Sequence, residues 1–151
     1  MHNSPAVKVA LAHIEAWSHH DWDKTRAMLA PDVHALVTST QREIGTSEFM
    51  GVDKYMELKT RAASLVEPGS VHVLGTVGDQ NTALTRIIFR IAMGPNGSLV
   101  TMARSCLYLL DENGKIKDER DSFFVLSQAA GGWSGHRVPV PETPYWASFC
   151  S

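Results

Sequence analysis

The chain has 151 residues, of which 44% are hydrophobic, and its 14 Lys and Arg residues against 16 Asp and Glu residues give a formal net charge of −2. This length allows one sizeable core and does not require a second domain. A basic block that could neutralise phosphates is lacking, as are a membrane-length apolar stretch and a signal-peptide pattern, so we expect a cytoplasmic protein with neither nucleic acid nor membrane as partner.

The first part of the chain is predicted to be mainly helical. Ser4-Pro5 and Asp21 can each cap the start of a helix, and Pro31 disfavours helical geometry in the residue before it. Apolar residues recur at helical spacing before Trp17 and again after the polar loop over residues 41–51. We expect helices over residues 5–19, 22–29 and 52–66, with a strand over 32–40.

After Glu67-Pro68-Gly69 the apolar period changes from helical spacing to alternation. Turn sequences rich in Gly, Asn and Asp separate four alternating runs, which is typical of antiparallel strands joined by hairpins. We expect strands over residues 70–78, 82–93, 99–110 and 115–127. The sequence therefore predicts an α+β domain over residues 1–127.

The last segment, 128–151, is rich in Gly and Pro but holds four large aromatic residues, Trp133, Tyr145, Trp146 and Phe149. This is a large apolar content for a solvated linker. We expect the segment to dock on the domain or on a partner subunit, with a partly disordered tail as the alternative.

Two motifs carry a resemblance to a known family. The run Asp21-Trp22-Asp23-Lys24-Thr25-Arg26-Ala27-Met28-Leu29-Ala30-Pro31-Asp32 is similar to the second helix and following strand of scytalone dehydratase. Asp111-Glu112-Asn113-Gly114-Lys115-Ile116, followed by Arg120-Asp121-Ser122-Phe123-Phe124, resembles a hairpin and last strand of the same superfamily. The chain thus resembles the SnoaL-like and scytalone dehydratase-like branch of the nuclear-transport-factor-2-like superfamily, whose members include polyketide cyclases, ketosteroid isomerase and limonene epoxide hydrolase.

The resemblance implies a cone-shaped fold, with three N-terminal helices packed on a curved antiparallel sheet that encloses one small-molecule pocket. It also implies which side chains face that pocket. These are His13 and Trp17 on the first helix, and Val33, Ala35, Val37, His72, Arg86, Ile88, Arg104, Cys106, Tyr108, Glu119, Asp121 and Phe123 on the strands.

The family's pattern implies roles for two of these residues. His72 stands where scytalone dehydratase carries its catalytic histidine, so it is the candidate general base. Asp121 matches the water-activating aspartate of limonene epoxide hydrolase. It would orient His72, with Glu119 and Asp21 as less favoured alternatives, since the family's aspartate partner is replaced here by Ser18. The structural alternatives are an ordinary strand histidine and a cross-strand Arg–Asp bridge.

Arg86 and His13 complete the predicted catalytic group, as side chains that stabilise charge on a substrate oxygen. Arg86 matches the arginine of the epoxide hydrolase triad, but Ile88 replaces the aspartate that follows it. The three catalytic positions of ketosteroid isomerase correspond to His13, Val37 and Cys106, which cannot supply that constellation.

The remaining inward residues are predicted to shape and bind the substrate: Trp17, Val37, Arg104, Cys106, Tyr108, Glu119 and Phe123. A small buried thiol is ordinary at Cys106. Adjacent side chains in His19-His20-Asp21 diverge, so we expect no metal, and the predicted chemistry requires no cofactor.

These features predict a cofactor-free acid–base enzyme acting on a small oxygenated apolar molecule, as a dehydratase, isomerase or cyclase of polyketide or terpenoid type. The alternatives are a non-catalytic small-molecule-binding or assembly module and, less favoured, an epoxide hydrolase. The predicted outer sheet face, with Ile87, Phe89, Ile91, Leu107 and Leu109, is apolar enough to form a homodimer. The sequence leaves open the substrate, the reaction and the partner of His72.

Overall fold

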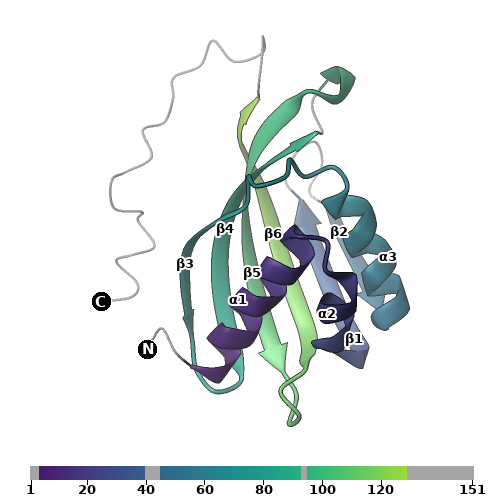
Figure 1. Ribbon diagram of the computed structural model, residues 1–151, viewed down its shortest axis with the longest axis vertical. Coiled ribbons are helices and arrows are strands. Elements are labelled where there is room, and N and C mark those ends of the chain that lie inside the picture. Colours follow the sequence, from purple (N-terminus) through teal and green to yellow (C-terminus); the bar gives the residue numbers. More distant parts are fainter. Residues whose placement is uncertain (1–3, 40–44, 93–94, 129–151) are drawn as a thin grey trace.

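The computed structural model describes residues 4–39, 45–92 and 95–128. Three α-helices and six strands follow one another along the chain (Figure 1). Their bounds are α1 Pro5–Ser18, α2 Trp22–Ala27, β1 Leu29–Ser39, β2 Gly45–Met50, α3 Val52–Ala63, β3 His72–Gly78, β4 Thr82–Ala92, a 3₁₀ turn Pro95–Gly97, β5 Leu99–Leu110 and β6 Ile116–Gln128. None of the helices in these ranges is long and apolar enough to cross a membrane.

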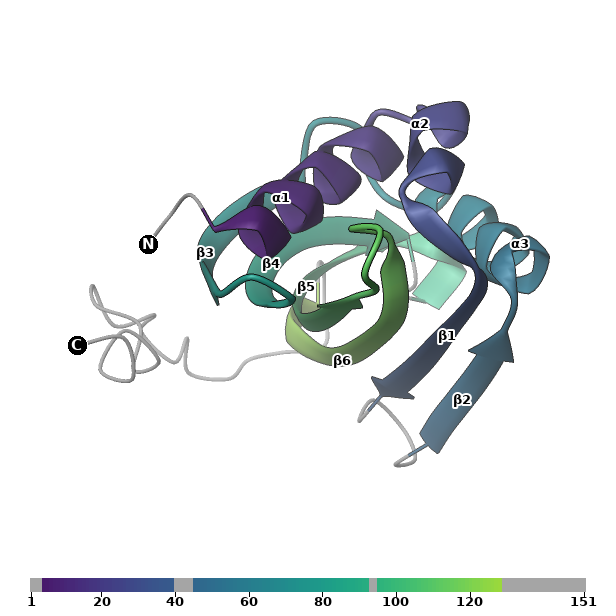
Figure 2. The ribbon, with the colours of Figure 1, turned by 90° about the horizontal axis from the view of Figure 1, so that it is seen from below.

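The six strands form one curved, open sheet in the order β2-β1-β6-β5-β4-β3. β1 runs parallel to β6, and the other neighbouring strands are antiparallel. The three helices lie on one side of this sheet, with α1 across β3, β4 and β5 and α3 beside β1 and β2 (Figure 2). The predicted α+β fold, with its antiparallel meander from β3 to β6, is confirmed.

The predicted helix caps are correct, whereas several boundaries differ. The Ser4 side chain accepts from the backbone N–H of Val7 at 3.3 Å, and Asp21 accepts from that of Lys24 at 3.2 Å. α2 ends at Ala27 and α3 at Ala63, both earlier than predicted, and β1 starts at Leu29. The tail beyond Gln128 lies outside the described residues.

The predicted polar loop over residues 41–51 is wrong in its second half, where β2 pairs with β1. Ser47, Glu48 and Met50 are exposed on this strand. An edge strand that leaves so much of its surface in solvent does not need the alternation of apolar residues by which strands are recognised.

The inner face of the sheet, toward the helices, carries two rows of buried side chains at its centre. In the first row Tyr108 of β5 pairs with Glu119 of β6, and in the second Cys106 pairs with Asp121. All four side chains are at most 5% exposed. Residues opposite one another in an antiparallel pair share a face, so these polar groups are brought under the helices together.

The predicted facing of β4 is wrong. Ile87, Phe89 and Ile91 are buried on the inner face, whereas Arg86 and Ile88 alternate with them and lie on the outer face. Side chains alternate along a strand, so an error of one residue in register exchanges the two faces of that strand.

His72 also lies on the outer face. It pairs with Ile88 and is exposed at the start of the edge strand β3. The register of β3 shifts between Val73 and Gly75, so positions on either side of this bulge do not follow one alternation. The predicted inward orientation of His72 is therefore wrong.

Close packing against the β3–β4 hairpin sets the position of α1. A Cβ atom at Gly78 would lie 2.5 Å from the carbonyl oxygen of Thr82 and 2.9 Å from a methyl group of Val7. Ala6, Val7 and Ala10 are fully buried in this contact. The later turns of the helix then bring His13 and Trp17 over the two polar rows.

Candidate functional site

Four buried side chains from three elements form a hydrogen-bonded cluster. The Tyr55 hydroxyl of α3 donates to Oε2 of Glu119, and Nζ of Lys59 donates to Oε1 of the same carboxylate at 3.1 Å. Nε2 of His13 lies 2.8 Å from the Tyr55 oxygen and 3.7 Å from Oε2 of Glu119. Each of the four residues is at most 5% exposed, so these contacts form away from solvent.

The charges of the cluster assign the proton on His13. Burial acts to raise the pKa of Glu119, but the positive charges of Lys59 and, more weakly, of Arg104 oppose it, so the pKa lies well below its usual value and Glu119 is ionised. The Tyr55 hydroxyl donates its only hydrogen to this carboxylate. In its contact with His13 it is therefore the acceptor, and Nε2–H of His13 is the donor. Burial lowers the pKa of His13, which makes the ring neutral and leaves Nδ1 as a bare acceptor.

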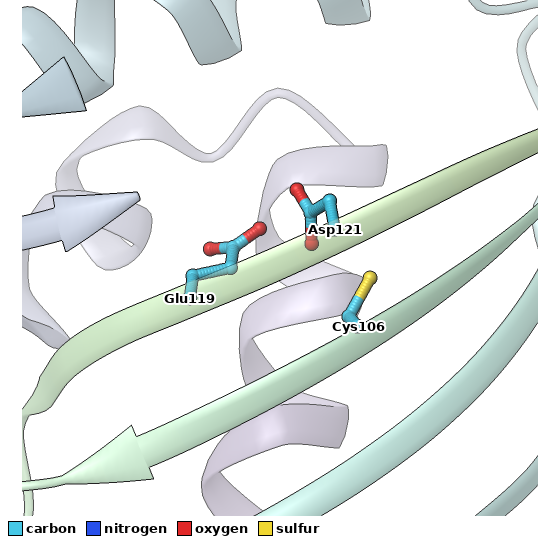
Figure 3. A group of neighbouring side chains, drawn as sticks. All are labelled: Cys106, Glu119 and Asp121. Atoms are coloured by element: carbon cyan, nitrogen blue, oxygen red, sulfur yellow. The ribbon is translucent and has the colours of Figure 1, made fainter. Parts of the chain in front are cut away.

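A second carboxyl group stands beside the first. Oxygen atoms of Glu119 and Asp121 and Sγ of Cys106 all lie within 4.8 Å of one another (Figure 3). Burial raises the pKa of Asp121 from 3.8 to about 7, and the negative charge of Glu119 adds to the rise. Near neutral pH, Asp121 is therefore divided between its acid and its carboxylate form.

Arg104 closes the site on the side of α1. Its guanidinium lies over the Trp17 ring at 4.9 Å and over the Phe123 ring at 5.7 Å. Its Nε donates to Sγ of Cys106 at 2.8 Å. Burial raises the pKa of that thiol, so Cys106 is neutral and supplies no counter-charge.

Several buried polar atoms around these side chains have no hydrogen-bond partner in the described part of the chain. They are Nδ1 of His13, Nε1 of Trp17, Nη2 of Arg104, the hydroxyl of Tyr108 and Oδ1 of Asp121. Unpaired buried polar groups are rare in proteins, and a concentration of them is typical of a site that binds a polar molecule.

A cavity of about 280 Å³ reaches this group of residues at Trp17. It lies between the end of α1, with Trp17 on its wall, and the segment 63–69, and its other wall residues include Ala63, Val66 and Pro68. A cavity of about 340 Å³ lies elsewhere, on the outer side of the sheet, where it is lined by His72, Ile88 and Arg90 among others.

The structure brings most of the predicted site residues together but separates two of them from the rest. His13, Trp17, Arg104, Cys106, Tyr108, Glu119, Asp121 and Phe123 gather on the inner face, next to half-buried Val37. His72 and Arg86 lie on the outer face of the sheet. The predicted pairing of His72 with Asp121 is therefore not formed.

Tyr55 and Lys59 were not predicted as site residues. Lys59 offers a signal that could have found it, because it lies at helical spacing between Met56 and Ala63 on the apolar face of α3. A buried lysine requires a partner, and its partner here is Glu119. Tyr55 fits the apolar face equally well as a core residue, so its spacing alone indicates no polar role.

Cys106, Glu119 and Asp121 have the spacing of metal ligands, but their surroundings do not suit a cation. Lys59 already neutralises Glu119, and Arg104 places a second positive charge against Cys106. Both the thiol and Asp121 would have to lose protons before they could bind a metal ion. This charge balance favours proton transfer or binding of an anion over binding of a metal.

Solved structures similar to this one share its fold at low sequence identity. An epoxide hydrolase from M. tuberculosis, of the limonene epoxide hydrolase-like type, is 23% identical with a TM-score of 0.60 over 80% of this chain and 83% of the other. A protein from Shewanella denitrificans described as a SnoaL-like polyketide cyclase is 12% identical, with a TM-score of 0.62 over 79% and 90%. A steroid delta-isomerase from Pseudomonas aeruginosa is 11% identical, with a TM-score of 0.59 over 81% of each chain.

A search of curated proteins finds no significant match. The sequence itself matches the SnoaL-like domain family over residues 10–119. That range holds His13 and Trp17 of α1, all of α3, and the residues Arg104, Tyr108 and Glu119, and it ends two residues before Asp121. With this match over most of its length, and with the fold of the nuclear-transport-factor-2-like superfamily, the chain belongs to the SnoaL-like domain family.

Proposed function

We propose that this protein is an acid–base enzyme in which Asp121 transfers a proton to or from a small, oxygenated, mostly apolar substrate. The observation that carries the proposal is the environment of the Asp121 carboxyl group. It is buried beside the ionised Glu119, and its Oδ1 has no partner among the described residues. A carboxyl group in such a position can hold a proton near neutral pH and has an atom free for substrate.

The other unpaired atoms supply the remaining functions. The hydroxyl of Tyr108 can donate a hydrogen bond to a carbonyl or hydroxyl oxygen that gains negative charge during the reaction. Nδ1 of His13 can accept a proton, while Tyr55, Glu119 and Lys59 act as positioning residues that fix the ring and its tautomer. Trp17 and Phe123 offer apolar surface for the rest of the molecule.

The reaction class is an elimination, isomerisation or cyclisation. These reactions share one step, in which a proton leaves a carbon atom next to a carbonyl group and negative charge develops on the carbonyl oxygen. A base beside hydrogen-bond donors, in a site from which water is excluded, suits that step. Structural neighbours named as a polyketide cyclase and a steroid isomerase are consistent with this class.

Proton exchange with solvent tests the proposal, because it requires only the shared proton-transfer step and not the complete reaction. The purified protein is incubated in D₂O with a panel of small ketones, hydroxyketones and oxo acids, and deuterium incorporation next to the carbonyl is followed by NMR. We expect exchange on at least one compound, at least 100-fold slower in Asp121→Asn, because removal of a general base costs about 10²–10⁴-fold.

His72→Ala is the matched control, because His72 is exposed on the opposite face of the sheet. We expect its exchange rate to stay within about twofold of that of the unchanged protein. Equal rates in the protein and in Asp121→Asn, or loss of exchange only in His72→Ala, would contradict the assignment. Absence of exchange with every compound would favour the alternative, a binding or assembly module.

We also propose that the protein forms a homodimer through the outer sheet face. The corrected facing of β4 changes the residues that would form it. Leu84 and Phe124 are 45% and 40% exposed on this face, and Leu107 of β5, which pairs with Leu84, is half-buried. An exposed apolar surface on a sheet is typical of an interface between subunits.

A further inference from the structure

The buried guanidinium of Arg104 lacks an anionic partner. Among the described residues, no carboxylate lies within ion-pair distance of it, and its Nε donates to a neutral thiol. Glu119 is the ionised carboxylate nearby, and it is already neutralised by Lys59 at 3.1 Å. A buried cation without a counter-ion is costly, and while Asp121 holds its proton the site has one positive charge in excess.

The Nη2 edge of the Arg104 guanidinium can donate hydrogen bonds to a ligand. Its carbon lies over the rings of Trp17 and Phe123, and Nη2 has no hydrogen-bond partner in the described part of the chain. A planar guanidinium that stacks on aromatic rings presents its N–H groups in its own plane, where they match the two oxygen atoms of a carboxylate.

The indole N–H of Trp17 is a second hydrogen-bond donor beside Arg104. Nε1–H of Trp17 is buried and unpartnered among these residues, and the ring that carries it also forms part of the wall of the 280 Å³ cavity. The wall of that cavity includes Ala63, Val66 and Pro68, so its surface suits an apolar group. His19, His20 and Glu67 border the cavity as well, and the Glu67 carboxylate forms an ion pair with Arg90.

We infer that Arg104 and Trp17 form a carboxylate-binding subsite, and that the ligand is a small organic acid whose apolar body lies in the cavity between α1 and residues 63–69. This inference rests on the proposed function and names its substrate class. The acid group is held by Arg104, which leaves Asp121, Tyr108 and His13 for the reacting part of the molecule. The positive charge of Arg104 then contributes to recognition of the substrate.

Ionisation of Asp121 opposes binding of the acid. Its carboxyl group interacts electrostatically with ionisable groups on the elements around it: Tyr55 and Lys59 on α3, Arg104, Cys106 and Tyr108 on β5, and Glu119 on β6. When Asp121 loses its proton it adds a negative charge to this group and cancels the excess on Arg104. Affinity for the acid therefore decreases as the pH rises past about 7, the pKa of Asp121.

Calorimetric titration of the full chain with phenylacetate and with its neutral analogue phenylacetamide at pH 6 tests the inference. Hexanoate and hexanamide form a second pair with a different apolar body. We expect at least one acid to bind at least tenfold more tightly than its amide, and the indole N–H signal of Trp17, assigned with Trp17→Phe, to shift in the NMR spectrum on titration.

The variants are Arg104→Met, which removes the charge, Arg104→Lys, which keeps it, and Arg86→Met on the outer face as the matched control. We expect the preference for the acid to disappear in Arg104→Met and to persist in Arg86→Met. If Arg104→Met does not fold, a preference in Arg104→Lys that is weakened at least threefold supports the same conclusion.

Equal binding of acid and amide to the unchanged protein, or no binding of either acid at millimolar concentration, would overturn the inference. Asp121→Asn separates it from the proposed function. We expect that variant to lose proton exchange but to keep its preference for the acid, and to keep it equally at pH 6 and pH 8. Loss of exchange without any acid preference leaves the catalytic proposal standing and refutes the subsite.

Discussion

The carboxyl groups of Glu119 and Asp121 lie side by side on the inner face of β6, and Lys59 forms an ion pair with the first but not with the second. This difference sets their pKa values apart, since the pKa of Glu119 is held well below its usual value while that of Asp121 rises to about 7. Two neighbouring carboxyl groups in different protonation states are a frequent basis of acid–base catalysis.

The raised pKa of Asp121 predicts how stability depends on pH. A carboxyl group that keeps its proton more tightly in the folded state favours folding at low pH, and this contribution is lost as the pH rises from 3.8 to about 7. Asparagine does not titrate, so we expect Asp121→Asn to avoid this loss of stability. The unfolding free energy of the variant minus that of the unchanged protein should therefore increase from pH 5 to pH 8.

Urea unfolding of both proteins at the two pH values measures this difference. The part of the pKa shift that falls between pH 5 and about 7 is of the order of 3 kcal/mol, and relaxation of the site reduces it. A stability difference that stays constant between pH 5 and pH 8 would show that Asp121 titrates alike in the folded and unfolded chains.

Removal of Lys59 should destabilise the fold. Lys59→Met would leave the Glu119 carboxylate buried without its cation, and breaking one partner of a buried ion pair costs about 3–5 kcal/mol. The double variant Lys59→Met, Glu119→Gln removes both charges and should recover a large part of that loss. Lys54→Met, on the exposed side of the same helix, is the control and should change the unfolding free energy by less than about 0.5 kcal/mol.

Loss of the Tyr55 hydroxyl should allow His13 to adopt either of its two neutral tautomers. In the unchanged protein we expect ¹⁵N NMR to show a protonated Nε2 and a bare Nδ1, because Nε2–H donates to Tyr55. Tyr55→Phe removes that acceptor, so the two forms should mix and proton exchange with the substrate should slow by about tenfold, less than the loss of a general base itself. A protonated Nδ1 in the unchanged protein would contradict the assigned direction of these hydrogen bonds.

The proposed homodimer predicts that one charge on the outer sheet face separates the subunits. We expect light scattering to give a dimer at micromolar concentration and a monomer with an unchanged circular dichroism spectrum for Phe124→Asp. An equivalent change at exposed Glu48 to Lys, on the far edge strand β2, should leave the dimer intact. A monomeric unchanged protein would refute the assembly.

Most elements of the fold, β2 excepted, could be predicted because helix caps, hairpin turns and the change of apolar period are local signals, and the family resemblance implied how these elements are arranged. The resemblance also implied that Asp121, Glu119, Arg104 and Tyr108 share one face, and they do so because β5 and β6 alternate without interruption between residues 104 and 108 and between 119 and 123.

Two kinds of error followed from features that are not local. The facing of β4 depends on its register with β5, and the position of His72 depends on a bulge in β3, neither of which leaves a clear mark in the residues. Lys59 and Tyr55 reach Glu119 only because α3 packs against the sheet, where Lys59 meets a carboxylate 60 residues further along the chain. No spacing rule within one segment connects them.

The proton on Asp121 is the point on which the catalytic proposal depends, and ¹³C NMR titration of the aspartate carboxyl groups measures it directly, with Asp121→Asn to assign the signal. The account predicts a midpoint close to 7 for Asp121, moving to lower pH when Glu119→Gln removes the neighbouring charge. A midpoint near 3.8, unchanged by Glu119→Gln, would contradict it.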